Sequence, residues 1–157
     1  MSDKSKKISD LVAQASEQGL NPHYAGYFHC FNRALFFEAH EVLEVLWLND
    51  RRGPEGAFYK GLIQLAGAFV HLQKLRLGPA AALFRLARSN LGGYPKHHHR
   101  LDVAKTIEMI DHWQRFLAAS GDAAPHVVAQ PAPKLELLAR ARGELRRHHA
   151  GLSRVVE

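Results

Sequence analysis

The sequence predicts an all-α protein, a single-domain bundle of about five core helices with an extra helical segment at each end. Three observations support this fold class. Apolar residues recur at helical spacing along most of the chain, no stretch alternates convincingly between apolar and polar residues, and glycine and proline stand where helices would end or begin. With 157 residues, of which 46% are hydrophobic, the chain suits one domain with one core.

The expected organisation has four parts. Residues 1–21 form an N-terminal arm, 22–120 the helical core domain, 121–133 a linker, and 134–157 a basic amphipathic C-terminal helix. The linker is predicted from its alanine and proline content. The last helix is expected over residues 135–149, with apolar residues inward and arginines outward.

The first elements follow from their start and stop signals. Ile8, Leu11 and Val12 indicate a short helix in the arm, which Gly19 ends. Pro22 fits the first turn of an aromatic-rich helix, because proline lacks the N–H group that a first turn leaves unbonded. Residues 32–33 could form either a tight turn or a continuous helix.

Two strongly patterned helices follow, over residues 34–48 and 57–74, joined by a loop at 49–56. The second is apolar on almost every side, which is typical of a central helix. Gly61 and Gly67 inside it weaken it by about 1 kcal/mol each relative to alanine, so we expect the backbone of a neighbour to approach closely there.

Two more core helices complete the bundle. One runs from Gly78 to Leu91 and ends at the glycine pair 92–93. The other begins after Asp102, whose side chain is a suitable N-cap.

Composition restricts the cellular setting. Cys30 is the only cysteine, so no intramolecular disulfide can form, and the N-terminal residues lack the apolar run of a secretory signal. No stretch is long and apolar enough to span a membrane. We therefore expect a cytoplasmic protein, with Cys30 as a small buried hydrophobe rather than a nucleophile.

The residues of chemical interest lie on the two patterned helices. His40, Glu41 and Glu44 share one side of the first, and Lys60, Gln64 and His71 follow one narrow line along the second. Buried polar groups need partners, because each unsatisfied one costs about 1 to 3 kcal/mol. If the loop folds the two helices antiparallel, the two polar stripes would meet and enclose a pocket.

The chain also resembles a known family. Residues 36–47, followed by 59–66, 78–80 and 101–103, are similar to domain of unknown function family 309, a set of small, mostly bacterial and archaeal, all-helical proteins. Its hallmark of His, three residues, Glu, two residues, then Trp or Tyr is met by His40, Glu44 and Trp47. The resemblance extends over about residues 24–117 and implies a helical fold and a suspected metal site.

Two positions depart from the pattern of that family. Lys60 stands where members often have glutamine, and Phe37 where several have tyrosine. A lysine beside the site would weaken the binding of a metal ion there.

These observations predict roles for seven residues. His40 and Glu44, one helical turn apart, and His71 are the expected ligands of a divalent ion such as Zn, Mn or Fe. Glu41 and Lys60 are the expected catalytic groups, with Trp47 and Gln64 lining the pocket. If the protein is an enzyme, metal-dependent hydrolysis is the leading reaction class, and the ligand could instead be an unknown small molecule.

Three alternatives stay open. The polar residues could form only a buried network, in which Glu41 or Glu44 pairs with Lys60 and Gln64 bonds His40. The stretch 56–101 holds no Asp or Glu, so its basic residues could bind nucleic acid or another polyanion: Arg85, Arg88, Lys96 and Arg100. The last helix could also dock between subunits of a homo-oligomer.

One histidine cluster receives a different interpretation. His97, His98 and His99 are consecutive in an expected loop, where adjacent imidazoles capture stray metal ions with modest affinity. We expect metal binding by this run to be adventitious.

Overall fold

The computed structural model of the chain describes residues 2–15, 19–120 and 130–139. These residues form six α-helices and one short β-hairpin, in the order α1 (Asp3–Gln14), α2 (Pro22–Phe31), α3 (Phe36–Asp50), α4 (Gly56–Gln73), α5 (Leu77–Leu91), β1 (His97–His98), β2 (Leu101–Asp102) and α6 (Val103–Ser120). The predicted all-α class is confirmed, with α2 to α6 as the five core helices. The hairpin is an element that the sequence did not predict.

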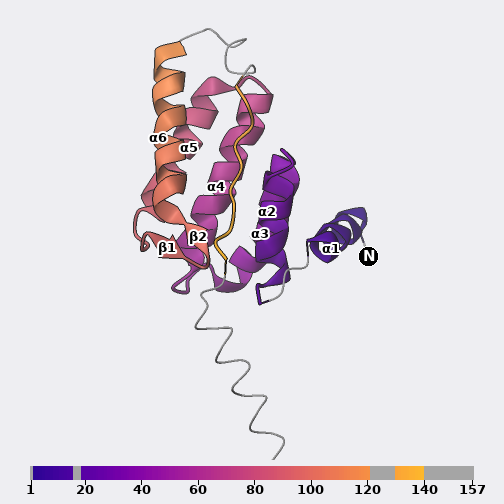
Figure 1. Cartoon of the computed structure of the whole chain (residues 1–157). Helices are drawn as coiled ribbons and strands as arrows, with labels where there is room; N and C mark the ends of the chain where they lie inside the picture. The colour runs from indigo at the N-terminus through magenta and orange to yellow at the C-terminus, as the bar shows by residue number, and fades with distance from the viewer. Residues whose placement is uncertain (1, 16–18, 121–129, 140–157) are drawn as a thin grey trace, which may run out of the picture.

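Helix α4 is the centre of the bundle. It packs against α3 and α5, and Figure 1 shows α5 and α6 on one side of it with α2 and α3 on the other. Phe69 of α4 illustrates this position, because its ring lies 5.0 to 5.7 Å from rings on four other helices: Phe31, Phe36, Phe84 and Trp113. These contacts place the aromatic core around α4.

The ends of the helices follow local chemistry. Asn21 caps α2 by accepting hydrogen bonds from the backbone of the first turn, and Pro22 follows it as predicted. The left-handed backbone of Ala34, with φ of 58°, separates α2 from α3, so residues 32–35 form a tight turn and not a continuous helix. Asp102 accepts from the backbone N–H of Lys105 at 3.0 Å, which confirms it as the N-cap of α6.

Close packing of α5 on α4 explains the two glycines inside α4. A Cβ on Gly61 would lie 2.9 Å from Leu91, and one on Gly67 would lie 3.2 Å from Leu83. The close neighbours are side chains of α5 and not the neighbouring backbone that the sequence led us to expect. The glycines let α5 pack closely against α4 at these two points.

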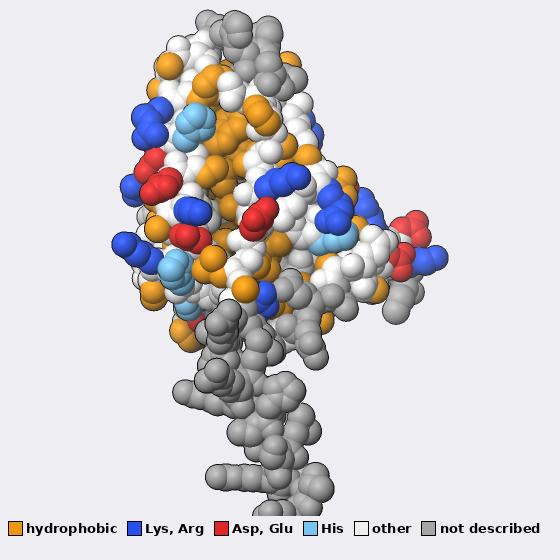
Figure 2. Space-filling view, viewed as in Figure 1, with side chains coloured by type: hydrophobic (Ala, Val, Ile, Leu, Met, Phe, Trp, Pro, Cys, Tyr) orange, Lys and Arg blue, Asp and Glu red, His pale blue; other side chains and the backbone are white. Residues whose placement is uncertain are grey.

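Residues 130–139, the extended segment, run along the bundle between α6 and α2 (Figure 1). Leu135 is buried, and the Asn32 side chain bonds its backbone twice, donating to its carbonyl at 2.9 Å and accepting from its N–H at 2.7 Å. Leu138 exchanges hydrogen bonds with Arg100 at 2.7 and 2.6 Å. The groove beside this segment is apolar, as Figure 2 shows, and includes a pocket of about 270 Å³ between Phe36, Trp113 and Pro133.

The extended segment corrects one prediction. A helix was expected to begin at Leu135, but residues 131–139 are not helical. The Asn32 side chain takes both backbone groups of Leu135, so they are not available for helical hydrogen bonds. The rest of the predicted helix, residues 140–149, and most of the predicted linker, residues 121–129, lie outside the described residues, and the fourfold division of the chain stays a prediction.

Two further expectations concern the chain as a whole. None of the described helices combines the length and apolar character that crossing a membrane requires. Cys30 is fully buried, and burial raises the pKa of its thiol to about 11, as expected for a structural rather than a nucleophilic cysteine.

Candidate functional site

His40 of α3 lines one pocket together with the polar stripe of α4, Lys60, Gln64 and His71, whereas Glu41 and Glu44 do not line it. A pocket of about 460 Å³ is lined by residues of α3, α4 and α5: Phe37, His40, Lys60, Ile63, Gln64, Gly67, Val70, His71, Leu83 and Leu86. Trp47, near the loop, contacts Lys60, whereas His40, farther from the loop, shares the pocket with His71. These two contacts show that α3 and α4 pack antiparallel.

The two imidazoles of the pocket each bury one nitrogen. The Nδ1 atoms of His40 and His71 are inaccessible to solvent and have no hydrogen-bond partner among the described residues. Nε2 of His40 lies 3.4 Å from a carboxylate oxygen of Glu44, one turn along α3. Because Nδ1 of His71 is inaccessible, Nε2 is the nitrogen of that ring that a molecule in the pocket can reach.

Lys60 and Gln64 have partners other than those of the predicted network. The Lys60 ammonium lies 4.3 Å from the centre of the Trp47 ring, a cation–π contact, and forms no ion pair within the described residues. The Gln64 side-chain carbonyl accepts from Asn90 of α5 at 2.7 Å. This leaves the Gln64 amide hydrogens as donors.

Glu41 does not belong to this pocket. It is buried and lies 3.4 Å from the Lys4 ammonium of α1, and it does not line the pocket. The expected stripe of His40, Glu41 and Glu44 is thus divided, because a step of one residue turns a side chain by roughly 100° around a helix. The catalytic role of Glu41 stays a prediction.

The predicted metal ligands do not gather around one point. Among the described residues, the group whose ligating atoms all lie within 4.8 Å of one another is Glu55, His98 and His99. His40, Glu44 and His71 are not such a group, although two of them line the same pocket. Their assignment as metal ligands stays a prediction.

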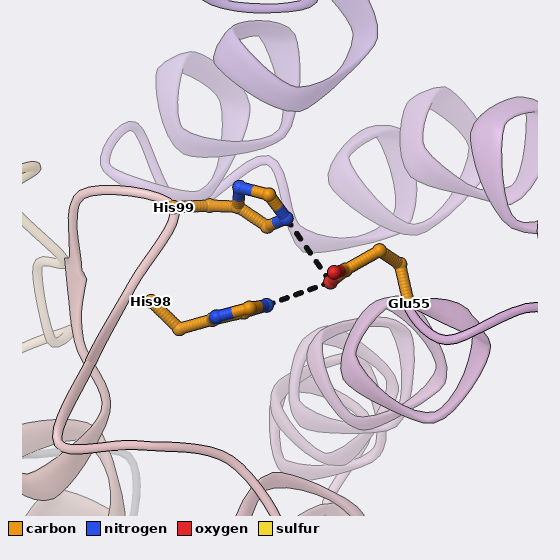
Figure 3. A group of neighbouring side chains, drawn as sticks. All are labelled: Glu55, His98 and His99. Atoms are coloured by element: carbon orange, nitrogen blue, oxygen red, sulfur yellow. Dashed lines mark hydrogen bonds and ion pairs between the residues drawn. The ribbon is translucent and has the colours of Figure 1, made fainter.

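The group that does gather joins the hairpin to the start of α4. Figure 3 shows His98 and His99 pointing toward Glu55, with both dashed lines converging on its carboxylate. Nε2 of His98 lies 2.7 Å from Glu55 Oε2, and Nε2 of His99 lies 3.0 Å from the same oxygen. We call these three residues the histidine–glutamate cluster.

A strained turn presents the two histidines. His98 pairs with Leu101, so His99 and Arg100 form a two-residue hairpin loop, and their φ values are 46° and 61°. Positive φ at both loop positions is typical of a type I′ turn, which usually carries Asn or Gly because other residues are strained there. The Tyr24 hydroxyl donates to the His99 carbonyl at 2.8 Å and helps to hold this conformation.

The other side of the cluster is held by Tyr94. Its hydroxyl donates to the Pro54 carbonyl at 2.8 Å and accepts from the Phe58 N–H at 3.0 Å, which fixes the chain on both sides of Glu55. Partial burial by itself raises the pKa of Glu55, but the hydrogen bonds and charges of His98 and His99 outweigh it and lower that pKa. The carboxylate is therefore ionised at neutral pH.

His97 is separate from its two neighbours. Its side chain is 65% exposed and lies 3.8 Å from Asp102 on β2, because successive residues of a strand point to opposite faces. From the sequence, the three histidines look like one run, but the fold separates His97 from His98 and His99. The one sequence feature that pointed to the cluster was the carboxylate of Glu55 directly before a helix. Glu55 lies 43 positions from His98, so no local pattern connects the two residues.

The basic stretch is partly neutralised by other parts of the fold. Arg88 donates to both carboxylate oxygens of Asp111 on α6, at 2.6 and 3.3 Å, which lowers the pKa of Asp111. Arg100 donates to the Leu138 carbonyl. Fewer cations are thus available to a polyanion than the sequence suggests, and polyanion binding stays a prediction.

Comparison with known proteins gives one match. Comparisons with curated proteins and with solved structures find none. The profile of a family described as a domain of unknown function (DUF309) matches residues 24–83, which hold all seven predicted site residues and Glu55 but neither His98 nor His99. The resemblance predicted from the sequence is thus confirmed over residues 24–83, where this chain resembles the family DUF309, whose description assigns no function. Its predicted extension to about residue 117 stays a prediction.

Proposed function

We propose that the protein binds one divalent transition-metal ion, of the zinc class, through Glu55, His98 and His99. The observation that carries the proposal is the convergence of two imidazole nitrogens and a carboxylate within 4.8 Å. Imidazole and carboxylate are ordinary zinc ligands, and two histidines with one glutamate are a donor set of catalytic zinc sites.

The distances suit such an ion. Ligands bound tetrahedrally at about 2.0 Å lie about 3.3 Å from one another. The two nitrogens lie 2.7 and 3.0 Å from the Glu55 oxygen, so a shift of a few tenths of an ångström would admit the ion. The strained turn supports the same interpretation, since strain of this kind concentrates at functional sites.

Three protein ligands leave a fourth position for water. A zinc ion lowers the pKa of bound water toward about 7, which is the basis of metal-assisted hydrolysis. Metal-dependent hydrolysis therefore stays the reaction class we propose if the protein is an enzyme, now located at this cluster rather than at His40, Glu44 and His71.

The experiment uses the full chain without an affinity tag, freed of metal by chelation. Titration with Zn²⁺ is followed by calorimetry, and titration with Co²⁺ by its visible absorption, which reports coordination number. We expect one site per chain with a tetrahedral Co²⁺ spectrum, and a loss of affinity of at least about tenfold in Glu55→Gln and in His99→Asn. Asparagine at 99 keeps a residue that tolerates positive φ.

His97→Asn is the matched control, because it shortens the histidine run equally but changes no cluster residue. It should leave affinity and spectrum unchanged. Loss of binding in His97→Asn equal to that in His99→Asn, or unchanged binding in Glu55→Gln, would show capture by an ordinary histidine run and would overturn the proposal. Circular dichroism of each variant checks that the helices are retained.

A further inference from the structure

We propose that the pocket between α3, α4 and α5 binds a small organic anion, with a carboxylate head and an apolar body. This site is separate from the histidine–glutamate cluster, since none of the cluster residues lines the pocket. Two of the residues that the sequence marked as metal ligands, His40 and His71, line this pocket.

The charge of the pocket indicates the sign of its ligand. No aspartate or glutamate lines it, and the Lys60 ammonium lies on the face of Trp47 without a carboxylate within 4.0 Å among the described residues. Glu44 does not line the pocket, but its carboxylate lies 3.4 Å from Nε2 of His40. A cation without an acidic partner attracts an anion.

Hydrogen-bond donors accompany the charge. Lys60, Gln64 and His71 follow one line along α4, and each has a donor that the described residues leave without an acceptor: the ammonium, the amide hydrogens and, when it carries the proton, Nε2. A carboxylate offers two oxygens and about four acceptor positions, enough for all three donors. A cation alone would find few acceptors here.

The remaining wall sets the chemistry of the ligand body. Phe37, Ile63, Val70, Leu83 and Leu86 supply an apolar surface, and Phe37 and Leu86 are about half exposed at 53% and 50%. A volume of about 460 Å³ lies within the usual range for small-molecule sites. A charged head near Lys60 and an apolar chain along Leu83 and Leu86 would use both surfaces.

The test compares octanoate with octanol, which has the same chain and no charge, by calorimetry and by chemical-shift perturbation of the full-length protein. We expect saturable octanoate binding with shifts at residues of the pocket, and weaker binding of octanol. Lys60→Met keeps the length of the side chain and should reduce octanoate affinity at least about tenfold, since it removes a charge-assisted hydrogen bond. Octanol affinity should hardly change.

Two variants control for charge and location. Lys74→Met removes an exposed cation just beyond α4 and should leave octanoate affinity unchanged. Leu86→Glu removes an apolar contact of the ligand chain and puts a negative charge at the exposed edge of the pocket, so it should weaken octanoate more than octanol.

Other outcomes would overturn the proposal. Absence of saturable octanoate binding would do so, as would equal losses in Lys60→Met and Lys74→Met. Glu55→Gln should bind octanoate normally, so this result and the metal titration fail or succeed independently.

Discussion

At the scale of single residues, Glu55 makes folding depend on pH. Its pKa is lowered in the folded protein by His98 and His99, against the opposing effect of burial. The unfolded chain therefore binds more protons than the folded one in the acidic range, and stability rises with pH there. The contribution is complete above the ordinary glutamate pKa of about 4.3 and is lost as the pH falls through the lowered value.

We therefore expect the free energy of unfolding of Glu55→Gln to fall below that of the wild type near pH 6 and to approach it near pH 3. Denaturant unfolding in the presence of a chelator measures this difference. Glu108→Gln, an exposed carboxylate of α6, is the control and should show a small, flat difference. A gap between Glu55→Gln and wild type that stays constant down to pH 3 would contradict the assignment.

At the scale of elements, the packing of α5 on α4 predicts that two glycine-to-alanine changes alter stability in opposite directions. A Cβ at position 61 would lie 2.9 Å from the Leu91 side chain, so Gly61→Ala forces a fully buried leucine to move and should cost about 1 to 3 kcal/mol. Gly78 in α5 has open space around its Cβ position, so Gly78→Ala should be neutral or stabilising by up to about 1 kcal/mol.

Thermal and denaturant unfolding of the two variants check this pair. Helix propensity alone favours alanine at both positions, so packing is the only reason for the effects to differ in sign. Stabilisation by both changes would mean that α4 and α5 are not packed closely at Gly61.

At the scale of the whole molecule, the extended segment 130–139 connects distant parts of the bundle. It bonds Asn32 at the end of α2 through Leu135, and Arg100 in the hairpin loop through Leu138. We expect Asn32→Ala to release Leu135 and to increase the amide hydrogen exchange of Leu135 and Leu138, because both side-chain bonds to the segment are lost.

Asn32→Asp is the comparison variant, since a carboxylate still accepts from the Leu135 N–H but no longer donates to its carbonyl. Its effect on exchange should be smaller than that of alanine. Equal exchange of Leu135 in wild type and Asn32→Ala would show that the segment is held by burial of Leu135 alone.

The two candidate sites differ in how much the sequence could predict. The pocket residues His40, Lys60, Gln64 and His71 lie on two consecutive helices joined by a short loop, so helical periodicity and antiparallel packing were enough to bring them together. Glu41 lies roughly 100° from His40 around α3, so it faces away from the pocket and forms an ion pair with Lys4 of α1.

The sequence by itself determined the helices, their ends and the polar stripe that becomes a pocket, because spacing, caps and breakers act over a few residues. Only the tertiary structure decided the union of Glu55 with His98 and His99, and the docking of Leu135 between helices. Both depend on contacts between residues 43 or more positions apart, where the path of the chain, and not the local pattern, sets which groups meet.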